Sequence, residues 1–300
     1  MRTHKFRFLV NPSARTVFAA VALSAALAVP ALAHPVEKHF AVDGRPIVIL
    51  RNANGRIQLK SWNRPEVMVI GTASSNSVSI DTEQVGSRIE IETHIVNQSA
   101  RGADLQMDYQ VTVPEESQLQ IRTDSGSITV ASVHGDLTFD TLAADVNLQD
   151  VGGTVTVTTA DGSVVCTRCD GNSFHAESVS GNVQLLQPIM DQITVHTTAG
   201  NILFDGDFLH HGLYYFKSDT GNTEVHFGPA SSFDLTASSA HGAVISQARL
   251  QPDKHGRNIR IPKTANALFG TVGAGNAKVE LYSFSGTIKI LNRDQTANVQ

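Results

Sequence analysis

The chain has 300 residues, a length that allows two average domains or one large all-β domain. Charged residues make up 17% of the chain and hydrophobic residues 41%, which argues against an intrinsically disordered protein. The net charge of -5 argues against a nucleic-acid binder, and 23 Gly with only two Cys favour short strands and tight turns over helices or a disulfide scaffold.

Residues 1–33 have the parts of a secretory signal peptide. Four basic residues precede the apolar run Val17 to Val29, and Ala31-Leu32-Ala33 supplies the small-residue cleavage pattern. A transmembrane anchor is the weaker interpretation, because the run is shorter than the ~20 residues that span a bilayer. We therefore predict cleavage before His34 and export to the periplasm, the extracellular space or the cell surface, with no transmembrane segment left.

Residues 34–117 are predicted to form an N-terminal β section that caps the rest of the protein. The segment around Gly55 alternates apolar and polar residues, as the later repeats do. The segments 66–72, 88–96 and 105–113 are longer and rich in strand formers, so we expect an antiparallel or sandwich-like arrangement that covers an open sheet edge.

From residue 118 onward the chain repeats every 18 to 21 residues. The repeats align on Gly126, Ala144, Gly162, Gly181, Gly200, Gly221 and Gly242. Apolar residues recur at fixed places around these anchors with a spacing of two, which predicts pairs of short strands with one face inward. Two isolated strands are only marginally stable, so the units must stack. Residues 118–300 are thus predicted to form a parallel β-solenoid, continuous with residues 34–117 as one domain, in which each repeat pairs with the next along the chain.

The anchor glycines (Gly126, Gly162, Gly181, Gly200, Gly221 and Gly242) are interpreted as structural turn residues that allow a positive φ angle. Three residues before each anchor stands a Ser or Thr, from Thr123 to Ser239, and these hydroxyls predict a buried ladder that satisfies the corner backbone. Around Gly286 the template returns, whereas residues 246–275 are less regular and contain a hydrophilic segment, 251–258, which we expect to be an exposed loop.

Three motifs occur in a characteristic order: Leu50 to Leu59 ahead of Trp62, the strand Tyr109 to Pro114, and Arg122 to Val130 followed by the repeats. In this order they resemble the bacterial putative-adhesin family of exported β-strand-repeat proteins, over nearly the whole of residues 34–300. The resemblance implies a β-helix-like fold at the cell envelope and an adhesive or structural role. It supplies no catalytic residues.

Cys166 and Cys169 form a C-x-x-C motif, which elsewhere indicates redox chemistry or half of a metal site. Here both cysteines fall on inward positions of the repeat, and no second pair is present to complete a zinc site. We expect either a local disulfide or two buried thiols.

Two outward rows are candidates for function. The first, predicted as a ligand face of regularly spaced polar groups, consists of Thr138, Thr156, His175, Thr194, Tyr215 and Thr236. Its alternative is an ordinary solvated sheet, since threonine favours strands. The second row, Glu177, His196 and Lys217, is interpreted as a charge ladder rather than acid/base machinery. The histidines at 175, 196, 210, 211 and 226 lack the spacing of a metal site.

Two classes of function remain. The first is an exported, non-catalytic solenoid that binds an envelope polysaccharide or a surface protein. The alternative is a polysaccharide-acting β-helix enzyme, a hydrolase or a lyase, which needs paired carboxylates in a groove. Asp124 and Asp161 fall near the anchor turns and Asp150 and Asp170 near the opposite turns, so we predict no catalytic residues, no metal site and no cofactor.

Charge is distributed unevenly along the chain. Residues 135–245 carry 2 basic and 13 acidic residues, whereas residues 246–300 carry 8 basic and 3 acidic ones. We therefore expect any contact with an anionic surface to be made by residues 246–300, and expect their deletion from a still-folded variant to weaken that contact.

Overall fold

The computed structural model describes residues 35–252 and 266–293, all within one compact unit, Ala33–Gln300. The predicted signal peptide and most of the predicted loop 251–258 lie outside the described residues. The described residues form strands, turns and one short 3-10 segment, η1 (Gly102–Leu105), with no α-helix among them. The all-β prediction is confirmed.

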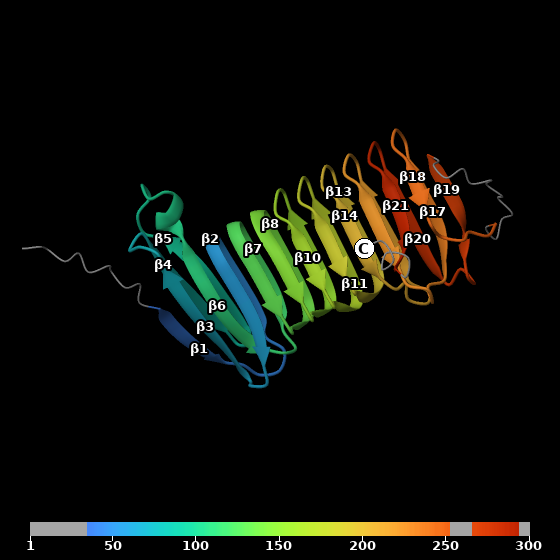
Figure 1. Cartoon of the computed structure of the whole chain (residues 1–300). Helices are drawn as coiled ribbons and strands as arrows, with labels where there is room; N and C mark the ends of the chain where they lie inside the picture. The colour runs from blue at the N-terminus through green and yellow to red at the C-terminus, as the bar shows by residue number, and fades with distance from the viewer. Residues whose placement is uncertain (1–34, 253–265, 294–300) are drawn as a thin grey trace, which may run out of the picture. The chain divides into compact units, whose positions relative to one another are not determined.

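Each repeat forms a coil of two strands joined at a corner (Figure 1). Three long strands run through the corner and supply both halves of a coil: β2 (Ile47–Trp62), β7 (Gln118–Ala131) and β8 (His134–Gln149). The next coils use separate strands: β9 (Gly152–Thr159) with β10 (Val164–Thr167), β11 (Asp170–Ser178) with β12 (Val183–Leu186), and β13 (Ile189–Thr197) with β14 (Ile202–Gly206). The remaining coils are β15 (Leu213–Ser218) with β16 (Thr223–Phe227), β17 (Phe233–Ser239) with β18 (Val244–Ser246), and β20 (Ala277–Ser283) with β21 (Ile288–Asn292).

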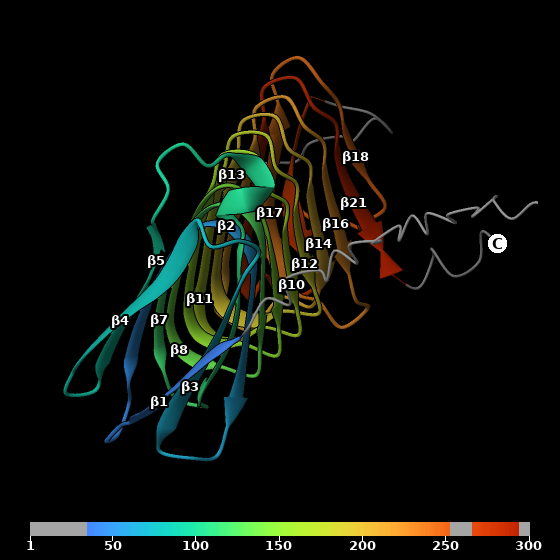
Figure 2. The same cartoon turned by 90° about the vertical axis from the view of Figure 1, so that its left-hand side faces the viewer.

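Equivalent strands of neighbouring coils pair in parallel and make two layers (Figure 2). We call the layer that contains β9, β11, β13 and β15 the first layer, and the layer that contains β10, β12, β14 and β16 the second layer. The registers match the sequence repeat, as in the row Val146, Val164, Val183 and Ile202 of the second layer. The inward residues of both layers form one continuous buried core between them, so the solenoid prediction is confirmed.

The N-terminal section contains both parallel and antiparallel strands. β5 (Arg88–Ile95) and β6 (Met107–Pro114) pair in parallel with the two halves of β2 and form a coil of their own. Outside this coil, β4 (Val78–Val85), β3 (Glu66–Ala73) and β1 (Val36–Ala41) add antiparallel strands. The predicted cap is therefore antiparallel only in its outermost strands.

The order of the coils differs from the prediction at the far end of the stack. β20 lies between β15 and β17, and β21 lies between β16 and β18, while β19 (Ala267–Val272) pairs antiparallel with β17. The expectation that every repeat pairs with the next along the chain was wrong here. The deletion of residues 246–300 is also no clean test of surface charge, because it removes a coil from inside the stack.

The prediction that the turn glycines allow a positive φ angle was wrong for most of them. Of the six, only Gly126 has a positive φ angle, 112°. At Gly162, Gly181, Gly200, Gly221 and Gly242 an added Cβ would overlap the carbonyl oxygen of the anchor residue in the adjacent coil. Glycine is needed because neighbouring corners approach each other too closely for any side chain.

The hydroxyl ladder satisfies the same corners. The backbone N–H groups of Gly162, Gly181 and Gly200 donate to the hydroxyls of the Thr or Ser three residues earlier, at 2.8 to 2.9 Å. The Thr141 hydroxyl also donates to the Thr159 hydroxyl of the next coil at 2.8 Å. The buried hydroxyls thus form hydrogen bonds with the turn of their own coil and, in places, with the neighbouring coil.

Candidate functional site

The threonine-rich row predicted as a ligand face lies on the outer side of the first layer. Thr138, Thr156, His175, Thr194 and Tyr215 stand opposite one another in consecutive coils, and all are half-buried. Glu280 of the inserted coil separates Tyr215 from Thr236, which are therefore not neighbours. The five side chains from Thr138 to Tyr215 thus form an unbroken polar row. Counted as far as Thr236, the row spans one coil more than the sequence indicated, because the inserted coil lies between Tyr215 and Thr236.

The row Glu177, His196 and Lys217 is in register, but its members do not pair with one another. Glu177 interacts with His175 of its own strand at 3.2 Å, and Lys217 with Asp219 at 3.2 Å. The Nε2 atom of His196 is buried and has no hydrogen-bond partner among the described residues. Glu177 and Lys217 each contact a residue of their own coil, and no hydrogen bond connects Glu177, His196 and Lys217.

Cys166 and Cys169 are fully buried and joined by a disulfide, with their Cα atoms 6.0 Å apart. The bond lies at the corner that follows β10, where Arg168 has a positive φ angle of 51°. Arg168 in turn donates two hydrogen bonds to Asp150 of the preceding coil, and this contact holds the pKa of the Asp150 carboxyl below its usual value. The disulfide and the Arg168–Asp150 hydrogen bonds are therefore structural contacts of this corner.

The histidines singled out in the sequence do not meet at one place. His210 and His211 touch each other, with ring centroids 3.9 Å apart, while His226 contacts Glu224 at 2.6 Å. Within residues 35–252 and 266–293, no group of three His, Cys, Asp or Glu residues could hold a metal ion.

One hollow brings two carboxylates together. Asp124 and Asp140, with Arg122, line a depression of about 470 Å³ on the first layer near the corner. Both carboxylates are exposed to solvent, and no hydrogen bond or ion pair joins them to each other or to Arg122. The repeat register predicted that no two acids lie close together on the outer surface. The hollow shared by Asp124 and Asp140 fits that prediction least.

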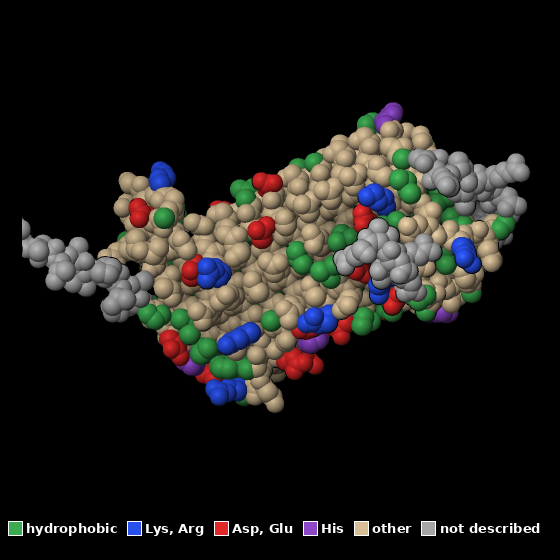
Figure 3. All heavy atoms as spheres, viewed as in Figure 1, with side chains coloured by type: hydrophobic (Ala, Val, Ile, Leu, Met, Phe, Trp, Pro, Cys, Tyr) green, Lys and Arg blue, Asp and Glu red, His purple; other side chains and the backbone are tan. Residues whose placement is uncertain are grey.

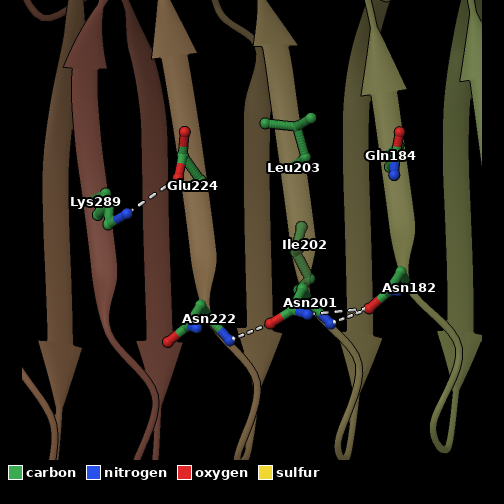
Figure 4. A pocket seen from close by; sticks show the side chains of 8 residues that line it. All are labelled: Asn182, Gln184, Asn201, Ile202, Leu203, Asn222, Glu224 and Lys289. Atoms are coloured by element: carbon green, nitrogen blue, oxygen red, sulfur yellow. Dashed lines mark hydrogen bonds and ion pairs between the residues drawn. The ribbon is translucent and has the colours of Figure 1, made fainter.

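A row of asparagines on the second layer was missed by the sequence analysis (Figure 4). The backbone N–H of Asn201 donates to Oδ1 of Asn182 at 2.8 Å, and that of Asn222 donates to Oδ1 of Asn201 at 2.9 Å. The row extends into the inserted coil, where the N–H of Thr287 donates to Oδ1 of Asn222 at 2.9 Å. Each amide oxygen therefore satisfies the backbone of the adjacent coil.

The asparagine row forms one wall of a hollow of about 350 Å³, which we call the amide groove. Its lining consists of Asn182, Gln184, Asn201, Ile202, Leu203, Asn222, Glu224 and Lys289. The Nδ2 atoms of Asn182 and Asn222 donate to no acceptor in the described part of the chain, so they remain available to a ligand. Leu203, half-buried, contributes an apolar surface.

Charge in the amide groove is confined to one end. Lys289 lies 3.5 Å from Glu224, which also contacts His226. Burial alone would raise the pKa of the Glu224 carboxyl, but the hydrogen bond with His226 and the positive charge of Lys289 outweigh it and lower the pKa below its usual value. Figure 3 shows the outer side of the second layer. Hydrophobic side chains, with few charges around them, lie in the region where Figure 1 labels β10 and β14.

The side chains that line the amide groove are mostly amides and aliphatic groups, with one carboxylate and one amine at its end. Its amide oxygens already accept hydrogen bonds, which leaves them poorly placed to hold a cation, and the two charged side chains in its lining, Glu224 and Lys289, pair with each other. A signal for the row was present, because Asn follows the anchor in three successive repeats. Lys289 could not be placed there from the sequence, since its coil was expected elsewhere.

Among the described residues there is no helix that could span a membrane.

Two-strand coils, stacked in parallel around one apolar core, define this protein as an all-β solenoid. The chain belongs to the Toastrack DUF4097 family, whose sequence pattern matches residues 48–291. Among curated proteins none matches it. One similar solved structure is that of a putative cell adhesion protein from Clostridium sporogenes, with 14% sequence identity, a TM-score of 0.25, and coverage of 87% of this chain and 100% of the other.

Proposed function

We propose that this chain is an exported, non-catalytic binding protein with an adhesin-like or envelope-structural role. Its ligand is an extended polymer, either an envelope polysaccharide or a surface protein, that lies across the strands. One observation carries the proposal: outward polar groups recur in register from coil to coil, about 4.8 Å apart, as the asparagines of the amide groove do. A polymer with its own repeat can contact several such groups at once.

Export rests on residues 1–33, which have the sequence of a signal peptide and lie outside the described structure. The threonine-rich row of the first layer is proposed as a second contact surface. Both surfaces are open and shallow, which suits a long ligand better than a small molecule, because small ligands need enclosure to lose most of their exposed area.

The test is a binding screen of residues 34–300 against envelope polysaccharides and extracted surface proteins, with turnover followed in the same samples. We expect binding without turnover. We also expect Gln184→Arg in the amide groove or Thr156→Arg in the threonine-rich row to reduce it, whereas Ala199→Arg, at an exposed corner, should not. Unchanged binding by both layer variants would show that the strand surfaces are not the site.

A second candidate function is the hydrolase or lyase, and it is favoured by the hollow that Asp124 and Asp140 share. Carboxylates at a glycosidase-like separation would act as acid and base or nucleophile. If any polysaccharide in the screen is cleaved, Asp124→Asn and Asp140→Asn should each abolish the cleavage. Cleavage that survives both substitutions would exclude this hollow as the site.

A further inference from the structure

The inserted coil brings together two tyrosines that are far apart in the sequence. Tyr215 of β15 and Tyr282 of β20 lie in adjacent coils on the outer side of the first layer, with ring centroids 5.6 Å apart and planes at 43°. Both side chains are half-buried. If the repeats stacked in chain order, Tyr215 would face Thr236 instead, and no aromatic pair would form.

The groups around the two rings are polar, and their charges are already paired. Lys217, which stands opposite Tyr282, interacts with Asp219 at 3.2 Å. Glu280, which stands opposite Tyr215, interacts with Lys278 at 3.0 Å. Because each charge has its partner, this surface offers no free cation or anion to a strongly charged ligand.

Uncharged hydrogen-bonding groups lie beside the rings. Thr194 stands opposite Tyr215 on the side away from Glu280. His196 follows two residues along the same strand, and its buried Nε2 atom has no partner among the described residues. Because this Nε2 atom is enclosed by protein, it is not a contact for a surface ligand, and half-buried Thr194 is the uncharged hydrogen-bonding residue that a ligand beside the rings can meet.

We propose that Tyr215 and Tyr282 form a sugar-binding platform, which takes a pyranose ring of a neutral polysaccharide. The inference rests on the proposed function and names its ligand class. A pyranose has one face of C–H groups that packs on an aromatic ring and an edge of hydroxyls that needs hydrogen-bonding partners. Tyrosine suits this task because its ring is apolar and its tip is polar, and it loses little conformational entropy on binding.

The platform also explains why the ligand would lie along the stack. The threonine-rich row from Thr138 through His175 to Thr194 ends at Tyr215, so a chain anchored on the rings can continue over polar side chains spaced about 4.8 Å apart. Aromatic anchors commonly supply most of the binding energy of an interface, while the surrounding polar contacts fix the orientation.

The experiment measures the affinity of residues 34–300 for cellohexaose, maltohexaose and mannohexaose by calorimetry, with polygalacturonate as an anionic probe and extracted surface protein as a third. We expect at least one neutral oligosaccharide to bind. Tyr215→Ala and Tyr282→Ala should each weaken that binding by about tenfold or more, whereas Tyr282→Phe, which keeps the ring, should stay within about threefold. Val179→Ala, at an exposed corner outside both proposed surfaces, is the matched control.

The thermal unfolding of each variant shows whether its fold is kept, and if one alanine variant unfolds, the other still tests the platform. Neutral oligosaccharide binding that is unchanged in both alanine variants overturns the platform but leaves the proposed function intact. Binding to polygalacturonate or to surface protein alone overturns the sugar assignment. If none of the probes binds, both the platform and the proposed function are wrong.

Discussion

From β7 to β14 each coil packs on the coil that follows it in the chain, whereas at both ends of the stack the neighbours come from distant segments. Contacts between middle coils join residues 18 or 19 positions apart, such as Thr141 with Thr159 and Ser180 with Asp161. Contacts of the end coils span 65 positions between Asn222 and Thr287, and 71 between Asn54 and Ser125. The same two-strand coil thus packs on its sequence neighbour in the middle of the stack and on a coil from a distant part of the chain at the ends.

The non-local connection places the first and the last coil of the described chain inside the stack. β2 has a strand neighbour on each side, and so have β20 and β21. Closing a loop of 65 rather than 19 residues costs about 1 kcal/mol more. In return, the last coil cannot fray like a terminal repeat with one neighbour, because both of its edges are hydrogen-bonded.

The largest effect is expected from removing a whole coil. Deletion of residues 170–188 takes out one middle coil and lets β13 pair with β9 in the register that β11 held, so a shorter folded protein should result. Deletion of residues 277–300 separates β15 from β17 and exposes both edges, so we expect aggregation. Soluble yield and circular dichroism of the two variants decide the matter. Equal tolerance of the two deletions would remove the distinction between middle and end.

Corner glycines should be intolerant in the middle and at the end alike. An added Cβ at Gly200 overlaps the backbone of Gly181, and one at Gly286 overlaps the backbone of Gly221, so the coils would have to separate. Gly200→Ala and Gly286→Ala should each lower the free energy of unfolding by about 3 kcal/mol or more. Chemical denaturation measures this, with Ala199→Ser at the same corner as the control. A tolerated Gly286→Ala would show that the last coil does not pack on Gly221.

Loss of a corner hydroxyl should have a smaller effect. Thr197 and Ser283 are buried, and their hydroxyls accept from the backbone N–H groups of Gly200 and Gly286. Thr197→Val and Ser283→Ala leave these donors without a partner, which should cost about 1 to 3 kcal/mol each in chemical denaturation. Thr198→Val, at an exposed neighbouring position, should cost less. Equal costs at 197 and 283 would show that the ladder continues unchanged through the inserted coil.

The sequence was sufficient for the parts of the fold that depend on local pattern. The spacing of two around the anchors predicted the strands, the inward faces and the hydroxyl ladder, because alternation and a fixed repeat are local properties. The position of residues 277–292 was not predictable in this way. Their pattern fits any place in the stack, and only the packing of particular corners decides between neighbours. The tyrosine pair and the position of Lys289 in the amide groove depend on that choice.

The reason for the corner glycines could not be read from the sequence either. A glycine required by positive φ and one required by close approach look the same along the chain, and only the structure shows that Gly126 is required for both reasons and Gly181 for close approach alone. The amide groove was missed for a different reason. Its asparagines were visible as a repeat, but an exposed Asn after a turn is common enough to be taken as turn chemistry alone.

The smallest expected effect concerns pH and the contact between Glu224 and Lys289 of the inserted coil. The pKa of Glu224 is lowered in the folded protein, so its contribution to stability is present above the unfolded pKa of about 4.3 and is lost as the pH falls through the lower folded value. Glu224→Gln should lower the free energy of unfolding by less than about 1 kcal/mol at pH 7, and the difference should vanish near pH 3. If the difference in unfolding free energy grows on acidification, the ionised Glu224 carboxylate does not stabilise the folded protein, contrary to this prediction.

The position of the inserted coil is tested most directly by disulfide cross-linking on the second layer. Lys289 stands opposite Glu224 on one side and Ile245 on the other, so Glu224 and Ile245 are two strands apart, about 9.6 Å. The paired variants Glu224→Cys with Lys289→Cys and Lys289→Cys with Ile245→Cys should form disulfides under mild oxidation, whereas Glu224→Cys with Ile245→Cys lies beyond disulfide reach. Cross-linking of residues 224 and 245, with none between 224 and 289, would show that the coils stack in chain order and contradict the account.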